Sequence, residues 1–162
     1  MKEIYLIFLA ITVYNSVGWS NDPVKVYKSF DQIEGYLKPQ GDTTLVVNFW
    51  ASWCRPCVEE MPVIEQVRQE MKNEKLKFLL ISLDDASDLE KSVAPLIDRL
   101  KITSKVIILD DTDYNSWIDK VDNSWSGAIP ATLFVNKNSR KLVEKSFKYE
   151  ELKETINKLK LK

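Results

Sequence analysis

The sequence predicts an α/β protein in which a central mixed β-sheet is flanked by helices. The first observation is an alternation of strand-like apolar runs with helical stretches, which is typical of parallel strands joined by right-handed crossovers. The second is a pair of strand-like runs on either side of a polar turn, which predicts an antiparallel hairpin near the C-terminus. The expected strands are residues 43–51, 76–83, 105–109, 131–136 and 141–147.

Apolar residues that recur at intervals of three and four predict the helices. The helix after the cysteines is expected to run to about Asn73 and to contain Pro62. The pattern from Ser87 to Glu90 is that of a capping box, which predicts the start of the next helix. The apolar positions of the five expected helices are Phe30, Ile33 and Leu37; Val58, Met61, Ile64, Val67 and Met71; Leu89, Val93, Leu96 and Leu100; Trp117, Ile118 and Val121; and Leu152, Ile156 and Leu159.

The composition is that of an ordinary globular protein. Of the 162 residues, 44% are hydrophobic and 29% are charged, and the formal net charge is −1. The length allows one domain of common size with a core of its own. So small a net charge argues against a nucleic-acid-binding surface. We expect one domain over residues 21–162, with residues 1–20 outside it.

The first 20 residues have the pattern of a secretory signal peptide. Lys2 supplies a positive charge, residues 4–14 are apolar apart from Thr12, and residues 16–18 are small enough for a signal peptidase. The apolar run has about half of the roughly 20 residues that a membrane-spanning helix needs. We therefore expect export to the periplasm or another extracytoplasmic space, with an uncleaved membrane anchor as the open alternative.

The acidic stretch from Asp111 to Asp122 imitates part of a calcium-binding loop. It lacks the glycine at the sixth position and the glutamate at the twelfth, and a strand rather than a helix precedes it. We interpret this stretch as a turn followed by a short helix. No metal site is expected in the chain.

The chain has two cysteines, Cys54 and Cys57, and no histidine. A buried strand precedes them and a helix follows, so Cys54 is expected at the helix N-terminus, where unpaired N–H groups and the helix dipole favour a thiolate. Cys57 lies one turn further on, within disulfide reach of Cys54. One sulfur can then be an accessible nucleophile while the other is shielded and attacks it in a second step. A dithiol redox catalyst needs this arrangement.

Three other uses of the cysteines are disfavoured. A stabilising disulfide that closes a loop of about four residues constrains the unfolded chain by only about 2 kcal/mol, against about 3 kcal/mol for fifteen residues. Structural zinc needs four Cys or His ligands, which this chain cannot supply. The strand-then-helix context argues against the chance spacing of two inert thiols. Redox chemistry is the preferred interpretation.

Residues 46–57, VVNFWASWCRPC, resemble the active-site segment of the thioredoxin superfamily. The continuation VEEMP at 58–62 is similar to the extracytoplasmic TlpA/ResA-like branch, and AIPATLF at 128–134 is similar to the cis-proline loop of the family. The resemblance runs from about Thr43 to the C-terminus. It implies a thioredoxin-like fold and the activity of a thiol–disulfide oxidoreductase.

The resemblance also implies roles for individual residues. Cys54 is expected to be the nucleophile and Cys57 the resolving cysteine. A cis peptide bond before Pro130 is expected to place its loop against the disulfide, with Ile129 offering backbone hydrogen bonds to a substrate. Trp53 and Pro56 complete the expected substrate-binding set. Trp53 and Trp125 either cover apolar surface beside the sulfurs or are ordinary packing aromatics.

Proton transfer is assigned to Glu60. Many thioredoxins carry a buried aspartate where this chain has Asn48, which cannot take a proton. In the ResA-like family, a glutamate at the position of Glu60 adjusts the cysteine pKa and takes part in proton transfer. Glu60 stands three residues after Cys57, so the two are neighbours on the helix. The open alternative is that Glu60, like Glu59, belongs to a solvated helix face.

The expected function is the reduction of disulfides in exported client proteins. The resemblance implies a membrane thiol transporter as electron donor, clients such as apocytochrome c, and so a part in cytochrome c biogenesis. No cofactor is expected. Arg55 favours the Cys54 thiolate while the two glutamates that follow oppose it, so the redox direction is not fixed by the charges. A disulfide-donating oxidase and a non-enzymatic thioredoxin-like binding module stay open.

Overall fold

The computed structural model describes residues 23–72 and 74–160. In this part of the chain, six strands form one sheet in the order β1-β4-β3-β2-β5-β6. The strands β1, β4, β3 and β2 run parallel to one another. The strand β5 runs antiparallel to β2, and β6 runs antiparallel to β5. The predicted mixed sheet is confirmed. The strands are β1 (Lys25–Tyr27), β2 (Thr44–Trp50), β3 (Leu76–Ser82), β4 (Lys105–Leu109), β5 (Ala131–Val135) and β6 (Arg140–Val143).

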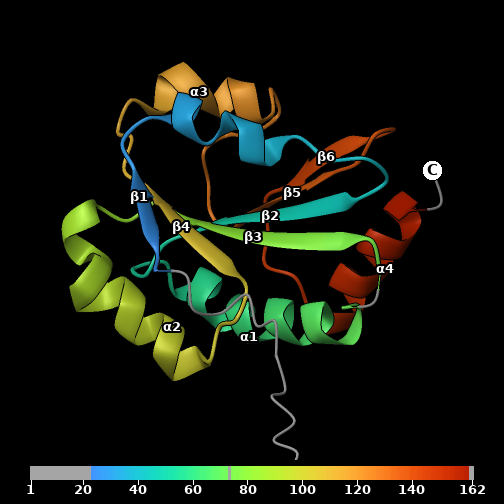
Figure 1. The fold of residues 1–162 in the computed structure, drawn as a ribbon, viewed down its shortest axis with the longest axis horizontal. Coiled ribbons are helices and arrows are strands. Elements are labelled where there is room, and N and C mark those ends of the chain that lie inside the picture. Colours follow the sequence, from blue (N-terminus) through green and yellow to red (C-terminus); the bar gives the residue numbers. More distant parts are fainter. Residues whose placement is uncertain (1–22, 73, 161–162) are drawn as a thin grey trace, which may run out of the picture.

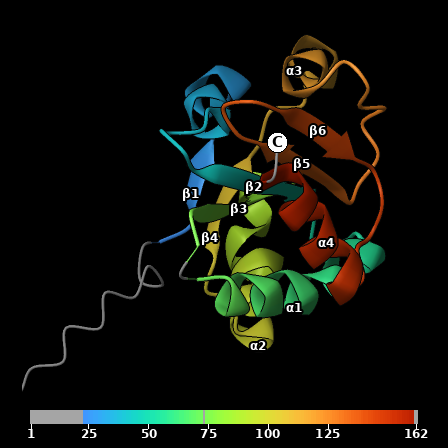
Figure 2. The ribbon, with the colours of Figure 1, turned by 90° about the vertical axis from the view of Figure 1, so that its right-hand side faces the viewer.

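Helices cover both faces of the sheet (Figure 1). One face carries α1 (Arg55–Glu70), α2 (Ala94–Leu100) and α4 (Tyr149–Lys160). The other carries α3 (Tyr114–Val121) and two short 3-10 helices, η2 (Phe30–Gln32) and η3 (Glu34–Leu37). Figure 2 shows the same two layers from the side, with the sheet between them.

The strand β2 is the centre of the molecule because all of its residues are buried. Successive side chains of a strand point to opposite faces of the sheet. Val46 and Trp50 join the core under α1, α2 and α4, whereas Val47 and Phe49 join the core under η2, η3 and α3. Both cores therefore fix the position of the chain where β2 ends and the two cysteines begin.

Most predicted elements are present, with some shifts. The segment with Phe30, Ile33 and Leu37 buries these residues as expected, but it forms 3-10 turns. The helix α1 ends at Glu70, before the predicted end, and β6 ends at Val143. The short edge strand β1 was not predicted, because only three residues pair with β4 and none of them is fully buried.

The predicted capping box at Ser87 is wrong. Asp85 caps this segment instead, since its Oδ1 accepts a 2.7 Å hydrogen bond from the Ser87 N–H. A 3-10 turn η4 (Ala86–Asp88) and a π-helical segment η5 (Leu89–Val93) then precede α2. Pro95 is the second residue of α2, which continues directly from η5, and because proline has no backbone N–H it cannot donate a hydrogen bond to the preceding turn.

The expected signal peptide, residues 1–20, lies outside the described residues. Over 23–72 and 74–160, no helix has the length and apolar character that crossing a bilayer requires.

Candidate active site

Cys54 and Cys57 form a disulfide at the amino end of α1. After β2, a turn closed by a 3.1 Å hydrogen bond from the Cys54 N–H to the Ala51 carbonyl leads into the helix, and Cys54 is its N-cap. Cys54 keeps 7% of its surface exposed, whereas Cys57 keeps none. The pair lies beyond the carboxyl end of a parallel strand, where α/β sheets place their sites. The two sulfurs are therefore unequal in access, as expected.

The loop before Pro130 lies against the disulfide. Cys54 Sγ is 3.8 Å from the Ile129 carbonyl oxygen, and the peptide bond between Ile129 and Pro130 is cis. Trp53, beside Cys54 in the sequence, is 68% exposed, and Pro56 is exposed as well. The fold thus gathers all of the expected substrate-binding residues around Cys54, although they come from segments about 75 residues apart.

Trp125 contacts the loop before Pro130 from the side of the protein core. Its indole Nε1–H donates a 2.9 Å hydrogen bond to the Ala128 carbonyl, and its ring packs on Phe49 with 4.6 Å between centroids. It is 4% exposed and belongs to the core under α3. Gly127 has φ +89°, a conformation that side chains rarely adopt. Of the two readings of Trp125, packing is the one the structure supports.

Glu60 is buried, not part of a solvated face. It is 2% exposed, and its Oε1 accepts a 2.7 Å hydrogen bond from the Phe147 N–H. Its Oε2 accepts a longer bond, 3.4 Å, from Asn48 Nδ2, which also donates to Thr132 Oγ1 at 3.0 Å. Burial raises the pKa of Glu60 to about 7, although the bonds from Phe147 and Asn48 act to lower it. This carboxyl group can therefore exchange a proton near neutral pH.

Sequence reasoning missed Thr132 and Phe147 as partners of this network. Thr132 lies on β5 directly opposite Asn48 on β2, so the register of the sheet creates that contact. Phe147 precedes α4 and reaches Glu60 through its backbone N–H, which every residue except proline provides. No residue type signals either contact, and the sequence does not predict the pairing of β2 with β5 that brings Thr132 to Asn48.

Arg55 and Glu59 are exposed and bind each other. The Arg55 Nε–H donates to Glu59 Oε1 at 2.8 Å, one helical turn apart. This ion pair holds the pKa of Arg55 above its usual range. The sequence predicts that Arg55 favours the Cys54 thiolate and that Glu59 opposes it. Because the two charges are paired with each other, their effects on Cys54 largely cancel.

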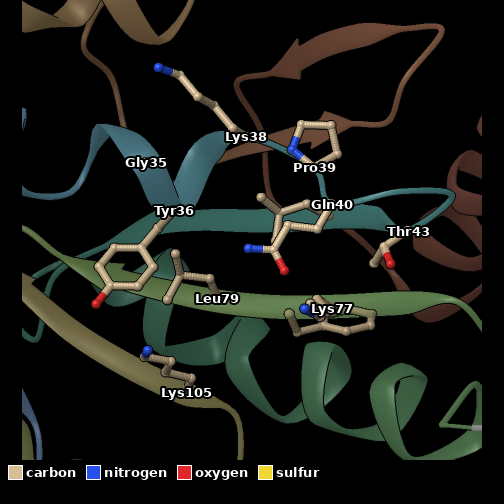
Figure 3. Close-up of a pocket in the computed structure, with 11 residues that line it drawn as sticks. Gly35, Tyr36, Lys38, Pro39, Gln40, Thr43, Lys77, Leu79 and Lys105 are labelled. Atoms are coloured by element: carbon tan, nitrogen blue, oxygen red, sulfur yellow. The ribbon is translucent and has the colours of Figure 1, made fainter.

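A separate pocket of about 210 Å³ lies at the other end of the sheet (Figure 3). Its lining includes Tyr36 of η3 and, from the sheet, Lys77 of β3 and Lys105 of β4. The Lys105 Nζ lies 4.5 Å from the centre of the Tyr36 ring, and the Tyr36 hydroxyl is 2.9 Å from that of Tyr27. These lysines begin or precede the buried part of their strands, whereas the disulfide follows the end of β2. The pocket is therefore distinct from the redox site.

The fold and the site define a class: thioredoxin-like proteins in which a Cys-x-x-Cys pair caps a helix, the arrangement of thiol–disulfide oxidoreductases. The chain belongs to the AhpC/TSA family, whose model matches residues 29–144. This match covers most of the described chain and includes the cysteines, the cis-proline loop and β6.

Individual relatives agree with this assignment. The thiol-disulfide oxidoreductase ResA of Oceanobacillus iheyensis is 28% identical over 152 residues, which cover 85% of this chain and 74% of that protein. The thioredoxin-like protein YneN of Bacillus subtilis is 34% identical over 64 residues, which cover 40% of this chain and 37% of that protein. The predicted similarity to the ResA type is confirmed.

Solved structures confirm the thioredoxin-like fold. A thioredoxin-related protein from Neisseria meningitidis serogroup B superposes with a TM-score of 0.66 at 18% identity, covering 90% of this chain and 98% of that one. StoA from Bacillus subtilis superposes with a TM-score of 0.56 at 21% identity, covering 72% and 84%.

Proposed function

We propose that this chain is an extracytoplasmic thiol–disulfide oxidoreductase that reduces disulfides in exported client proteins. The observation that carries the proposal is the asymmetry of the pair: Cys54 caps α1 and keeps 7% of its surface exposed next to exposed Trp53, whereas Cys57 is fully buried. The relatives named thiol-disulfide oxidoreductase ResA support the reaction type. The signal-peptide pattern of residues 1–20 supports the location.

In the first step, the Cys54 thiolate of the reduced protein attacks one sulfur of a client disulfide. A mixed disulfide forms between Cys54 and the client, and the other client sulfur leaves as a thiolate. The free N–H groups of the first turn of α1 stabilise the attacking thiolate. The Ile129 carbonyl is positioned to accept a hydrogen bond from the client backbone, and Trp53 offers apolar contact area.

In the second step, Cys57 attacks the Cys54 sulfur and the client leaves with its second thiol. Two electrons have then passed to the client, and the protein holds the Cys54–Cys57 disulfide. Cys57 must lose a proton before it attacks. Glu60 lies one helical turn away and has a pKa near 7, so it accepts that proton and passes it on.

The oxidised protein must be reduced again outside the cytoplasm, where small-molecule reductants are scarce. We infer that a membrane thiol transporter supplies the two electrons by the same exchange at Cys54. Suitable clients are exported proteins with paired cysteines that must be kept reduced, such as apocytochrome c. This assigns the chain a part in cytochrome c biogenesis.

A disulfide-reduction assay tests the proposal. The purified protein, supplied with dithiothreitol, should accelerate the reduction of insulin disulfides well above the rate with dithiothreitol alone. Cys54→Ser should abolish the acceleration because the nucleophile is gone. An unaltered protein no faster than Cys54→Ser would contradict the proposal and favour an idle disulfide in a binding module.

A further inference from the structure

A second buried carboxylate lies next to the active-site turn. Asp84 follows β3 and is 1% exposed. The ladder between β2 and β3 extends beyond the strands, because the Leu83 N–H donates to the Trp50 carbonyl at 2.8 Å. This contact places Asp84 beside the residues that connect β2 to Cys54.

Ser52 makes two hydrogen bonds to this carboxylate. Its backbone N–H donates to Asp84 Oδ2 at 2.8 Å, and its hydroxyl donates to Oδ1 at 2.6 Å. Ser82 completes the set: its hydroxyl donates to Oδ2 at 2.5 Å and accepts from the Asp84 N–H at 3.0 Å. Both carboxylate oxygens of Asp84 therefore accept hydrogen bonds from Ser52, one from its backbone and one from its side chain.

The partners of Asp84 carry no positive charge. None of the ion pairs in the described part of the chain includes it. Burying a carboxylate away from water is unfavourable, and neutral donors must offset the whole of that cost. An apolar residue at position 84 would pack at least as well without this cost. The presence of a buried aspartate is therefore better explained by the specific hydrogen bonds that its carboxylate accepts.

Ser52 lies inside the turn that delivers Cys54 to the helix. The turn is closed by the hydrogen bond from the Cys54 N–H to the Ala51 carbonyl, and it contains only Ser52 and Trp53 between these residues. Fixing Ser52 therefore restrains the backbone that leads to the Cys54 sulfur. The stabilisation of a thiolate by a helix N-terminus falls off within one turn, so it depends on where this sulfur is held.

We propose that Asp84 is a positioning residue for Cys54: through Ser52 it holds the turn so that the sulfur stays at the N-cap of α1. The inference rests on the proposed function in so far as Cys54 is the attacking thiol. Asp84 does not touch the sulfurs in this role and transfers no proton. It sets the reactivity of Cys54 through the backbone.

The test compares Ser52→Ala and Asp84→Asn with the unaltered protein. Both variants loosen the turn, so the pKa of the Cys54 thiol in the reduced protein should rise. A rise of about one unit for Asp84→Asn corresponds to about tenfold slower alkylation by iodoacetamide below that pKa. Ser52→Ala keeps the backbone hydrogen bond and should slow alkylation by roughly threefold, a rise of about half a unit. The pH dependence of the alkylation rate measures each pKa.

Glu65→Gln is the matched control. Glu65 is another buried carboxylate that accepts hydrogen bonds from Thr103 and Ser104, and unlike Asp84 it also forms an ion pair with Arg68. It stands eleven residues after Cys54 in α1, about 16 Å along the helix. This variant should lose stability while the pKa of Cys54 stays unchanged. If the role of Asp84 is merely structural, Asp84→Asn should likewise lose stability while the pKa of Cys54 stays unchanged.

Two outcomes would overturn the inference. One is an unchanged Cys54 pKa in both turn variants, with or without a lower melting temperature. The other is a lower pKa in Asp84→Asn with no change in Ser52→Ala, which would mean that the Asp84 charge acts on Cys54 directly. If Asp84→Asn does not fold, Ser52→Ala decides alone. Insulin reduction by the unaltered protein, measured in parallel, tests the proposed function separately.

Discussion

The Glu60 carboxyl group is joined to the Phe147 backbone by a 2.7 Å hydrogen bond, across 87 positions in the sequence. This bond ties the helix that carries the disulfide to the segment that leads into α4. It also fixes the carboxyl group in a buried site one turn from Cys57. The same contact therefore connects the stability of the fold to the proton chemistry that we assign to the site.

We expect Glu60→Gln to change how stability depends on pH. The folded-state pKa of Glu60, about 7, lies above the ordinary value of 4.5. Between these values the folded protein holds a proton that the unfolded chain has lost, so stability falls as pH rises from 4.5 to 7. The shift corresponds to roughly 3 kcal/mol of stability, and glutamine removes this dependence. Urea unfolding at a series of pH values measures it.

The quantity to compare is the difference between the variant and the unaltered protein at each pH. Other carboxyl groups contribute to the pH dependence of both proteins, and the subtraction removes them. The variant should gain stability relative to the parent as pH rises through this window. A difference that is flat across the window would mean that the pKa of Glu60 stays at its ordinary value, so its carboxylate is too weak a base to hold a proton from Cys57 near neutral pH.

Replacing the resolving cysteine should trap the intermediate. In Cys57→Ser, Cys54 can still attack a client disulfide, but no neighbouring thiol can release it. A covalent adduct with insulin should accumulate, disappear on addition of dithiothreitol, and be absent from the Cys54→Ser protein. Non-reducing gel electrophoresis and mass spectrometry detect it. The reverse pattern, with adducts on Cys57 in the Cys54→Ser protein, would exchange the roles of the two cysteines.

Trp125→Phe should weaken the loop that faces the disulfide. It deletes the 2.9 Å hydrogen bond to the Ala128 carbonyl, which costs about 1 kcal/mol, and it reduces the packed volume. Because Ile129 follows in the same loop, KM for insulin should also rise. Trp117→Phe is the control, since it loses a similar bond, 3.3 Å to the Asp111 carbonyl, in the same core. An equal rise in KM for both variants would show a general loss of stability instead.

The sequence predicts the parts of this fold that depend on local pattern. The apolar run of β2 and the spacing of Met61 and Ile64 place a buried strand before Cys54 and an amphipathic helix after it. Burial on both faces of β2 and on one face of α1 leaves few other arrangements. The position and unequal burial of the cysteines follow from these two elements.

What could not be predicted depends on contacts between distant segments. Asn48 meets Thr132 only through the pairing of β2 with β5, and Asp84 meets Ser52 only through that of β2 with β3. A buried aspartate after a strand looks the same in sequence as an exposed one in a loop. Asp85 replaced the expected cap at Ser87 for a related reason, because either residue can begin the turn and the fold selects one.

The most direct test of the proposed function is the reduction potential of the Cys54–Cys57 pair. The purified protein would be equilibrated against a series of dithiothreitol or glutathione mixtures, and the fraction of free thiols would be measured. A reductase that is recharged from the membrane should have a potential near that of thioredoxin, about −270 mV. A value near −120 mV, typical of a strong disulfide donor, would contradict the reductase assignment and make this protein an oxidase.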